Sequence, residues 1–320
     1  MKTRLVIAAV VIILLSLACD GGEEGPSQTT PASSPAPQAT AAGLPLTGTL
    51  PMGEIAFLSR RDGKGEIYLL TSQGEQNISN NEAEDEDPAI SPDGTKIAFS
   101  SNREGTSHIY VANIDGSDLT RLTHEGAGDF TPEWSPDGKR IAFTRAGSIM
   151  VMDSDGRNVQ KVKDPKPEST APPCEAGAFL GGWSPDGKRL TFYAASATTE
   201  LGQVCIINAD GTGLTVVASE PSGYHVEPSW SPNGEWIVYR FIYEGNHEIY
   251  KVKPDGSSPT NLTNSPAIDL EPAWSPDSQS IVFSSDREGN LDLHIMKADG
   301  SDVARVTSNP AKDSDPSWGP

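Results

Sequence analysis

One short motif recurs along this chain at nearly constant intervals. The motif Trp-Ser-Pro-Asp-Gly, or a variant of it, begins at Ile90, Trp134, Trp183, Trp230, Trp274 and Trp318. The serines of its turn stand at positions 91, 135, 184, 231 and 275, so the period is 44–49 residues. A period of this length predicts an array of similar structural units rather than one irregular domain.

The last full unit shows how each repeat should fold. Residues 271–274, 280–285, 291–298 and 302–307 are short apolar or alternating segments, as expected for four strands. The Ser-Pro-Asp-Ser turn (Ser-Pro-Asp-Gly in other units) separates the first two segments, and Asp299-Gly300 is a hairpin signal before the fourth. No long helical pattern interrupts the unit, so we expect an all-β repeat.

Six copies of the second strand can be recognised. They begin at Ile55, Ile97, Ile141, Leu190, Ile237 and Ile281. Four antiparallel strands per repeat of this length are typical of a propeller blade. The sequence therefore predicts an all-β fold, a six-bladed β-propeller of four-stranded antiparallel blades over residues 52–320.

The order of strands predicts how the ring closes. The first unit enters at its second strand, and the chain finishes with a first strand at residues 315–318. We therefore expect the C-terminal strand to join the first blade, which leaves no free sheet edge. Each Trp ends a first strand and should pack its ring between neighbouring blades.

These motifs resemble the TolB-like, WD40-like β-propeller repeats, over about residues 52–320. The resemblance is to the propeller only and does not include the N-terminal domain of TolB. Related repeats occur in the propellers of prolyl oligopeptidases and dipeptidyl peptidases. In TolB-like propellers one end of the channel can receive a partner's peptide. The resemblance therefore implies a module that recognises a protein or peptide at the channel mouth.

The first 19 residues have the pattern of an export signal. Lys2 and Arg4 precede an apolar run over residues 5–15, which is the length of a signal-peptide core. Ser16-Leu17-Ala18-Cys19 resembles the cleavage box of bacterial lipoproteins, in which the cysteine carries the lipid. We expect a lipoprotein signal peptide ending at Cys19. The alternative is an ordinary secretory signal in which Cys19 has no role.

Residues 20–51 are rich in Pro, Ser, Thr and Ala and should form a disordered tether. The expected protein is exported, anchored to the cell membrane through the lipid, and faces the periplasm or the cell exterior. Its expected partner is an unknown envelope protein or peptide, and we expect a monomer. The net charge of −20 argues against binding to nucleic acid, because the phosphate backbone would be repelled.

Acidic residues precede the tryptophans at two aligned positions. Five residues ahead of the Trp position stand Asp85, Asp129, Ala178, His225, Asp269 and Asp313. Three residues ahead stand Asp87, Thr131, Leu180, Glu227, Glu271 and Asp315. First strands should line the channel, so the eight acids and one histidine at these positions are candidates for a negatively charged binding site. The alternative is a set of structural ion pairs with Arg61, Arg103 and Arg287, which recur at equivalent positions.

His225 replaces the aspartate of other repeats. A histidine beside carboxylates could serve as a base or metal ligand. The alternative function is therefore a metal-assisted glycan lyase or hydrolase that uses His225 and neighbouring carboxylates. A hydrogen-bonded histidine without catalytic role is the simpler interpretation. No catalytic, metal-binding or cofactor-binding motif is present, so the sequence predicts no catalytic residue, metal or cofactor and favours a binding protein over an enzyme.

Two cysteines remain beyond Cys19. Cys205 lies on an expected strand, and Cys174 lies in a connection, residues 163–179, that is longer than its equivalents. An exported protein can keep a disulfide between them, and two buried thiols are the alternative.

Overall fold

The computed structural model describes residues 53–320 except 127, 166–173, 197–200 and 220–222. Sixteen of the strands lie in four antiparallel sheets of four strands each. The first sheet contains β24 (Asp313–Gly319), β1 (Glu54–Ser59), β2 (Glu66–Thr71) and β3 (Gly74–Asn77). The second contains β4 (Asp85–Ile90), β5 (Lys96–Ser101), β6 (His108–Asn113) and β7 (Thr120–Arg121). The third contains β8 (Asp129–Trp134), β9 (Arg140–Arg145), β10 (Ser148–Asp153) and β11 (Gln160–Lys163). The fourth contains β20 (Asp269–Trp274), β21 (Ser280–Ser285), β22 (Asp292–Lys297) and β23 (Ala304–Arg305).

The all-β class is confirmed, but the predicted six separate four-stranded blades are wrong. Within the described residues, four such sheets form, and the remaining strands make one eight-stranded sheet. Its strands are β12 (Gly177–Trp183), β13 (Arg189–Ser196), β14 (Leu201–Asn208), β15 (Thr215–Ala218), β16 (Tyr224–Trp230), β17 (Ile237–Tyr243), β18 (Asn246–Val252) and β19 (Thr260–Asn261).

A glycine explains why these eight strands are joined. The junction is a parallel pairing of Gly202 in β14 with Tyr224 in β16. A Cβ atom at Gly202 would lie 3.2 Å from the backbone nitrogen and oxygen of His225. A side chain would therefore crowd the neighbouring strand, and glycine allows the two backbones to approach.

The Ser-Pro-Asp-Gly turns are held by their own polar groups. In the third sheet, the Ser135 hydroxyl donates to Asp137 over 2.7 Å, and the Gly138 amide donates to the Ser135 carbonyl over 2.8 Å. Gly138 has a φ of 68°, which is in the left-handed region that glycine adopts at low cost. The motif thus places a tight reversal between the first and second strand of each unit.

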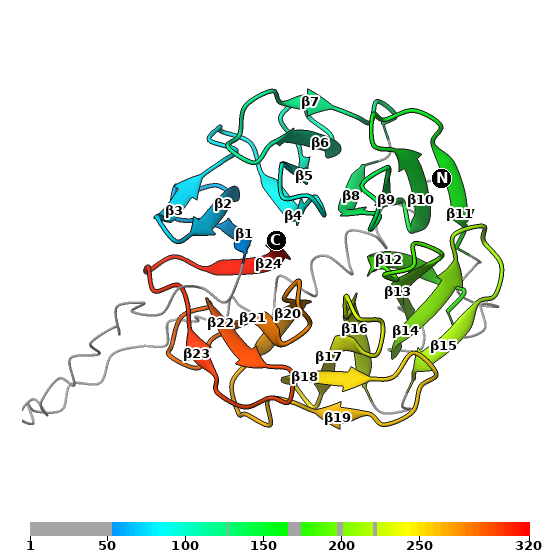
Figure 1. Cartoon of the computed structure of the whole chain (residues 1–320), viewed down its shortest axis with the longest axis vertical. Helices are drawn as coiled ribbons and strands as arrows, with labels where there is room; N and C mark the ends of the chain where they lie inside the picture. The colour runs from blue at the N-terminus through cyan, green and yellow to red at the C-terminus, as the bar shows by residue number, and fades with distance from the viewer. Residues whose placement is uncertain (1–52, 127, 166–173, 197–200, 220–222) are drawn as a thin grey trace, which may run out of the picture. The chain divides into compact units, whose positions relative to one another are not determined.

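The strands that contain the Trp positions close into a ring. Figure 1 shows β4, β8, β12, β16, β20 and β24 nearest the centre of the arrangement, and we call these the inner strands. β24 pairs with β1, with Trp318 opposite Ile55, so the predicted closure by the C-terminal strand is confirmed. Neighbouring inner strands contact one another around the whole ring.

The apolar core lies between neighbouring groups of strands. One buried cluster, for example, joins Ala98 and Ile109 of the second sheet to Trp134 and Phe143 of the third. The Trp134 indole N–H donates to the Ala89 carbonyl across this boundary over 3.1 Å. The tryptophans therefore pack between neighbouring groups as predicted, and each contributes a large buried apolar surface. Among the described residues, we find no helix with the length and apolar character needed to cross a membrane.

Candidate binding site at the propeller channel

The inner strands share an unusual backbone conformation three residues before the Trp position. Five non-glycine residues there have φ between 50° and 56°: Asp87, Thr131, Glu227, Glu271 and Asp315. The pairing register with the next strand shifts at the same place, as between Glu86 and Ala89, which marks a β-bulge. A left-handed conformation costs a non-glycine residue about 1 kcal/mol. Because the conformation recurs at five aligned positions, it is a feature of the repeat. It takes the side chain at this position out of the strand's normal alternation.

Four of these residues are carboxylates, Asp87, Glu227, Glu271 and Asp315, which we call the inner carboxylates. Each accepts a hydrogen bond from the backbone of the next inner strand. The Glu271 amide donates to Glu227 over 3.1 Å, and the Asp315 amide donates to Glu271 over 2.7 Å. The Asp87 amide donates to Asp315 over 3.2 Å, and the Thr131 amide donates to Asp87 over 3.0 Å. The inner carboxylates therefore form one continuous arc along β16, β20, β24 and β4.

Three of the inner carboxylates, Asp87, Glu227 and Asp315, hold protons more tightly because they are partly shielded from water. Burial, together with the charge of Asp87, raises the pKa of Asp315 well above its usual range. Burial raises the pKa of Glu227 to about 7, with Arg240 opposing the rise and the charge of Glu271 adding to it. Arg240 is buried and forms an ion pair with Glu227 over 2.6 Å. The arc is therefore a concentration of like charge that a cation would stabilise.

Glu133 extends this charge and was not singled out from the sequence. It stands one residue before Trp134, where the other units have Ala, Gly or Ser. Burial raises its pKa to about 8, helped by the charge of Asp87. Arg240 was also missed, although the equivalent positions in the other units hold uncharged residues, Leu58, Ser100, Thr144, Tyr193 and Ser284. In both cases the available signal was a charged residue at a position where the other units have uncharged ones.

The second row of predicted site residues lies elsewhere. We call Asp85, Asp129, Asp269 and Asp313 the paired aspartates, since each is fully buried beside an arginine. The ion pairs are Arg103–Asp85 at 3.0 Å, Arg145–Asp129 at 2.6 Å, Arg287–Asp269 at 2.9 Å and Arg61–Asp313 at 3.1 Å. The guanidinium groups also lie over aromatic rings of the same sheets, with Arg61 4.2 Å from the centre of the Tyr68 ring. These contacts support the interpretation of this row as structural ion pairs.

His225 is a packed side chain inside the eight-stranded sheet. It is 1% exposed and contacts the rings of Tyr239 at 5.4 Å and Phe241 at 4.7 Å. Burial lowers its pKa to about 4, so it is neutral at pH 7. Among the described residues, no group of three or more His, Cys, Asp or Glu side chains is arranged to hold a metal ion.

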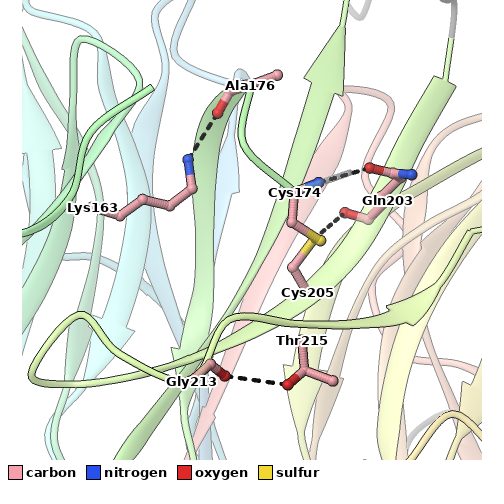
Figure 2. Close-up of a disulfide and its surroundings, with 7 residues drawn as sticks. All are labelled: Lys163, Cys174, Ala176, Gln203, Cys205, Gly213 and Thr215. Carbon is pink, nitrogen blue, oxygen red and sulfur yellow. Dashed lines mark hydrogen bonds between the residues drawn. A yellow bond between two sulfur atoms is a disulfide. The ribbon is translucent and has the colours of Figure 1, made fainter. Parts of the chain in front are cut away.

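β12 lacks both acids. Different contacts stabilise the segment that leads into it. Cys174 and Cys205 form a disulfide, shown in Figure 2, and the Cys174 amide donates to Gln203 over 2.8 Å. The Lys163 ammonium donates to the Ala176 carbonyl over 2.9 Å, as Figure 2 also shows. The cysteines are 31 residues apart, and closing a loop of that size stabilises a fold by about 3–4 kcal/mol in the chain-entropy model. The rest of the long connection, residues 166–173, lies outside the described residues, as do Cys19 and the whole of residues 1–51.

Comparisons with known proteins agree with this architecture. The model of the TolB beta propeller domain family matches residues 51–148 and 144–320. A TolB homolog from Chlorobium luteolum is 30% identical over 181 residues, which are 55% of this chain and 28% of that protein. The Tol-Pal system protein TolB of Desulfosudis oleivorans is 36% identical over 85 residues, which are 25% of this chain and 19% of that protein.

The crystal structure of TolB from Acinetobacter baumannii has the same fold, with a TM-score of 0.71 and 22% sequence identity. The likeness covers 83% of this chain and 66% of that one. The chain thus matches less than a third of the length of these two curated relatives. Because the family model covers nearly all of the described residues, the chain belongs to the TolB beta propeller domain family.

Proposed function

We propose that this protein is an exported, lipid-anchored binding module whose channel recognises a basic segment of an envelope protein or peptide. The observation that supports the proposal best is the arc of inner carboxylates. Their side chains are only partly covered by protein, and their backbone is held in the same left-handed bulge on four inner strands. A structural role alone would be served by hydrogen bonding, whereas crowded carboxylates with raised pKa values gain most from an incoming cation.

The names of the relatives support an envelope protein as the partner. One of them is named as a Tol-Pal system protein, and it is 36% identical to this chain over 85 residues. The net charge of −20 adds long-range attraction for basic partners and repulsion of acidic ones. The rigid ring supplies a preorganised surface, which lowers the entropic cost of binding.

Neutralising the arc should weaken binding without unfolding the protein. The test variant combines Asp87→Asn, Glu271→Gln and Asp315→Asn, since each amide keeps an oxygen that can accept the neighbouring backbone hydrogen bond. We expect retention of the partner to fall roughly tenfold, because each lost charge contributes about 0.5 kcal/mol. The measurement is affinity capture from envelope extract on immobilised protein, with the retained protein identified and quantified by mass spectrometry.

The matched control removes the same number of charges at exposed positions: Asp118→Asn, Asp155→Asn and Glu235→Gln. It should retain the partner as well as the native protein does, and both variants should keep the native unfolding midpoint. Equal retention by the native and arc variants would refute the channel site. Equal losses in the arc and control variants would show that binding depends only on net charge.

The anchor is proposed to be the lipid on Cys19. In the full chain, Cys19→Ser should abolish incorporation of labelled palmitate, because the lipid has no other attachment point in the proposal. If the native chain takes up no lipid, or the variant takes up as much as the native chain, Cys19 is not the anchor.

A further inference from the structure

In four of the six units, a side chain of the second strand contacts the left-handed residue of the inner strand. The side chain comes from the same position of the second strand in each case. The pairs are Ser100–Asp87 at 2.8 Å, Thr144–Thr131 at 2.8 Å, Arg240–Glu227 at 2.6 Å and Ser284–Glu271 at 2.9 Å. These four units therefore satisfy the polar group of the inner strand from within.

The unit of β24 and β1 has the carboxylate of this pair but not its donor. Leu58 of β1 pairs with Ser314 as Ser100 of β5 pairs with Glu86, so a leucine stands where Asp315 would need a donor. Among the described residues, the Asp315 carboxylate accepts one hydrogen bond, from the Asp87 amide to Oδ2 over 3.2 Å. Its Oδ1 atom is thus left for a ligand.

The unit of β12 and β13 has the donor but no acceptor. Tyr193 pairs with Phe179 as Thr144 pairs with Phe130, and the inner residue of this unit is the apolar Leu180. The Tyr193 side chain is 7% exposed, and its ring stacks on Phe179 with centres 4.9 Å apart. Within the part of the chain that the structure describes, its hydroxyl makes no hydrogen bond. A buried hydroxyl without a partner loses free energy that a ligand can restore.

These two incomplete units lie across the ring from each other. The inner strands contact one another in the order β24, β4, β8, β12, β16 and β20, so β12 and β24 are three places apart in either direction. Figure 1 shows them on opposite sides of the centre. Burial raises the pKa of the Tyr193 hydroxyl, and the charges of Glu227, Asp87 and Asp315 add to the rise. The hydroxyl is therefore within electrostatic reach of carboxylates on three inner strands.

The free groups indicate which cation fits. A guanidinium binds a carboxylate best through both oxygens, but the Oδ2 atom of Asp315 already accepts the Asp87 amide. An ammonium is a compact charge with three donors and needs one oxygen from each acceptor. The Tyr193 hydroxyl can accept from the same ammonium and donate its own hydrogen to a neighbouring carbonyl of the ligand.

We propose that Asp315 and Tyr193 hold a primary ammonium group of the ligand between them, from a lysine side chain or from the amino terminus of a chain. This inference rests on the proposed channel site and names the group that the site selects. The ligand supplies the partners that the other four units provide internally.

The probe is the blocked pentapeptide acetyl-Gly-Ser-Lys-Ser-Gly-amide, titrated against the full chain by saturation-transfer NMR, which observes the peptide. The comparison peptide carries arginine in place of lysine and should bind about threefold more weakly. Gly-Ser-Gly-Ser-Gly-amide with a free amino terminus tests the other source of the ammonium. Tighter binding of either ammonium peptide than of the arginine peptide supports the proposal and identifies the source.

Two substitutions test the two contacts. Asp315→Asn should weaken binding of the ammonium peptide about tenfold, the loss of a charge-assisted hydrogen bond, and Tyr193→Phe about threefold, the loss of an ordinary one. Tyr193→Phe should also reduce the preference over the arginine peptide, which a change in packing alone would not do. The matched control is Tyr110→Phe on β6, which is not an inner strand. It removes a hydroxyl that donates to Glu104 over 3.0 Å and should leave the affinity unchanged.

Single substitutions within the arc separate this proposal from the channel site as a whole. Asp87→Asn and Glu271→Gln should each weaken binding less than about threefold, because serine hydroxyls already bond these carboxylates. Equal losses in these variants and in Asp315→Asn would overturn the ammonium position and leave the channel site standing, since capture of the partner by the arc variant tests that site separately. Unchanged affinity in Tyr193→Phe, or no preference for an ammonium over the arginine peptide, would also overturn the proposal.

Discussion

Replacing Asp129 with alanine is expected to lower the free energy of unfolding by about 3–5 kcal/mol, the largest effect of any single substitution discussed for this protein. Asp129 is fully buried and receives two hydrogen bonds from Arg145, of 2.6 and 2.9 Å. Removing the carboxylate leaves a guanidinium that is only 9% exposed without its main buried partner. The measurement is the midpoint and slope of urea unfolding for the native and variant proteins.

The matched control removes both charges at once. The double variant Asp129→Ala, Arg145→Met should recover most of the lost stability, since no unpaired buried charge remains and methionine keeps the contact with Phe143 that the arginine makes at 5.2 Å. β12 shows that the fold tolerates this arrangement, because Ala178 occupies the equivalent position there. A loss below about 1 kcal/mol in Asp129→Ala would mean that the pair is not structural and would return Asp129 to the list of binding candidates.

The second large effect is a loss of stability as pH rises from 6.5 to 8.5, by about 2 kcal/mol or more. Glu133 and Glu227 have raised pKa values of about 8 and about 7 in the folded protein. The folded state therefore binds protons more tightly than the unfolded chain. The stabilisation is present below the unfolded pKa and is lost as pH rises through the folded value, because the ionised carboxylates then lie partly buried beside Asp87 and Glu271.

The variant Glu133→Gln isolates this contribution. It should be more stable than the native protein at pH 8.5 and should show a shallower decline between pH 6.5 and 8.5. Glu235→Gln, at an exposed position, should leave the pH profile unchanged. Stability that is constant across this pH interval, or a variant that is less stable at pH 8.5, would contradict the raised pKa of Glu133.

Buried histidines lower the folding stability at acid pH. Burial lowers the pKa of His225 and of His247 to about 4, so the folded state keeps them neutral. The unfolded chain binds protons at these residues below about pH 6.5, and folding stability therefore declines as pH falls through that range. The histidine and carboxylate contributions oppose each other between about pH 4.5 and 6.5, so maximum stability is expected within that interval.

Much of the fold could be predicted from the repeat because each copy carries its own local signals. The segment 280–285, read as a second strand, is β21 (Ser280–Ser285). The segment 302–307, read as a fourth strand, shrinks to β23 (Ala304–Arg305), because only two residues pair with β22. The joining of β14 to β16 depends on how closely Gly202 approaches Tyr224, a tertiary contact that no local pattern encodes.

The candidate site was less predictable because its backbone breaks the alternation of a strand. Residues two apart, such as Asp85 and Asp87, should point to the same side of a regular strand. The bulge and the φ of 55° at Asp87 turn the two side chains apart. Asp85 therefore forms an ion pair with Arg103, while Asp87 accepts a hydrogen bond from the Thr131 amide. The sequence places both residues before the Trp position but does not reveal the left-handed turn between them.

The pairing of β1 on both edges has a mechanical consequence. β1 lies between β24 and β2 and is hydrogen-bonded to each of them along its length. A pull on the N-terminal end of β1 is therefore resisted by two sets of backbone hydrogen bonds, one to β24 and one to β2. These bonds share the load, whereas the bonds of a strand at a free sheet edge would open one after another. Strain carried by the proposed membrane tether would thus reach the part of the ring where the first and last strands of the propeller are hydrogen-bonded to each other.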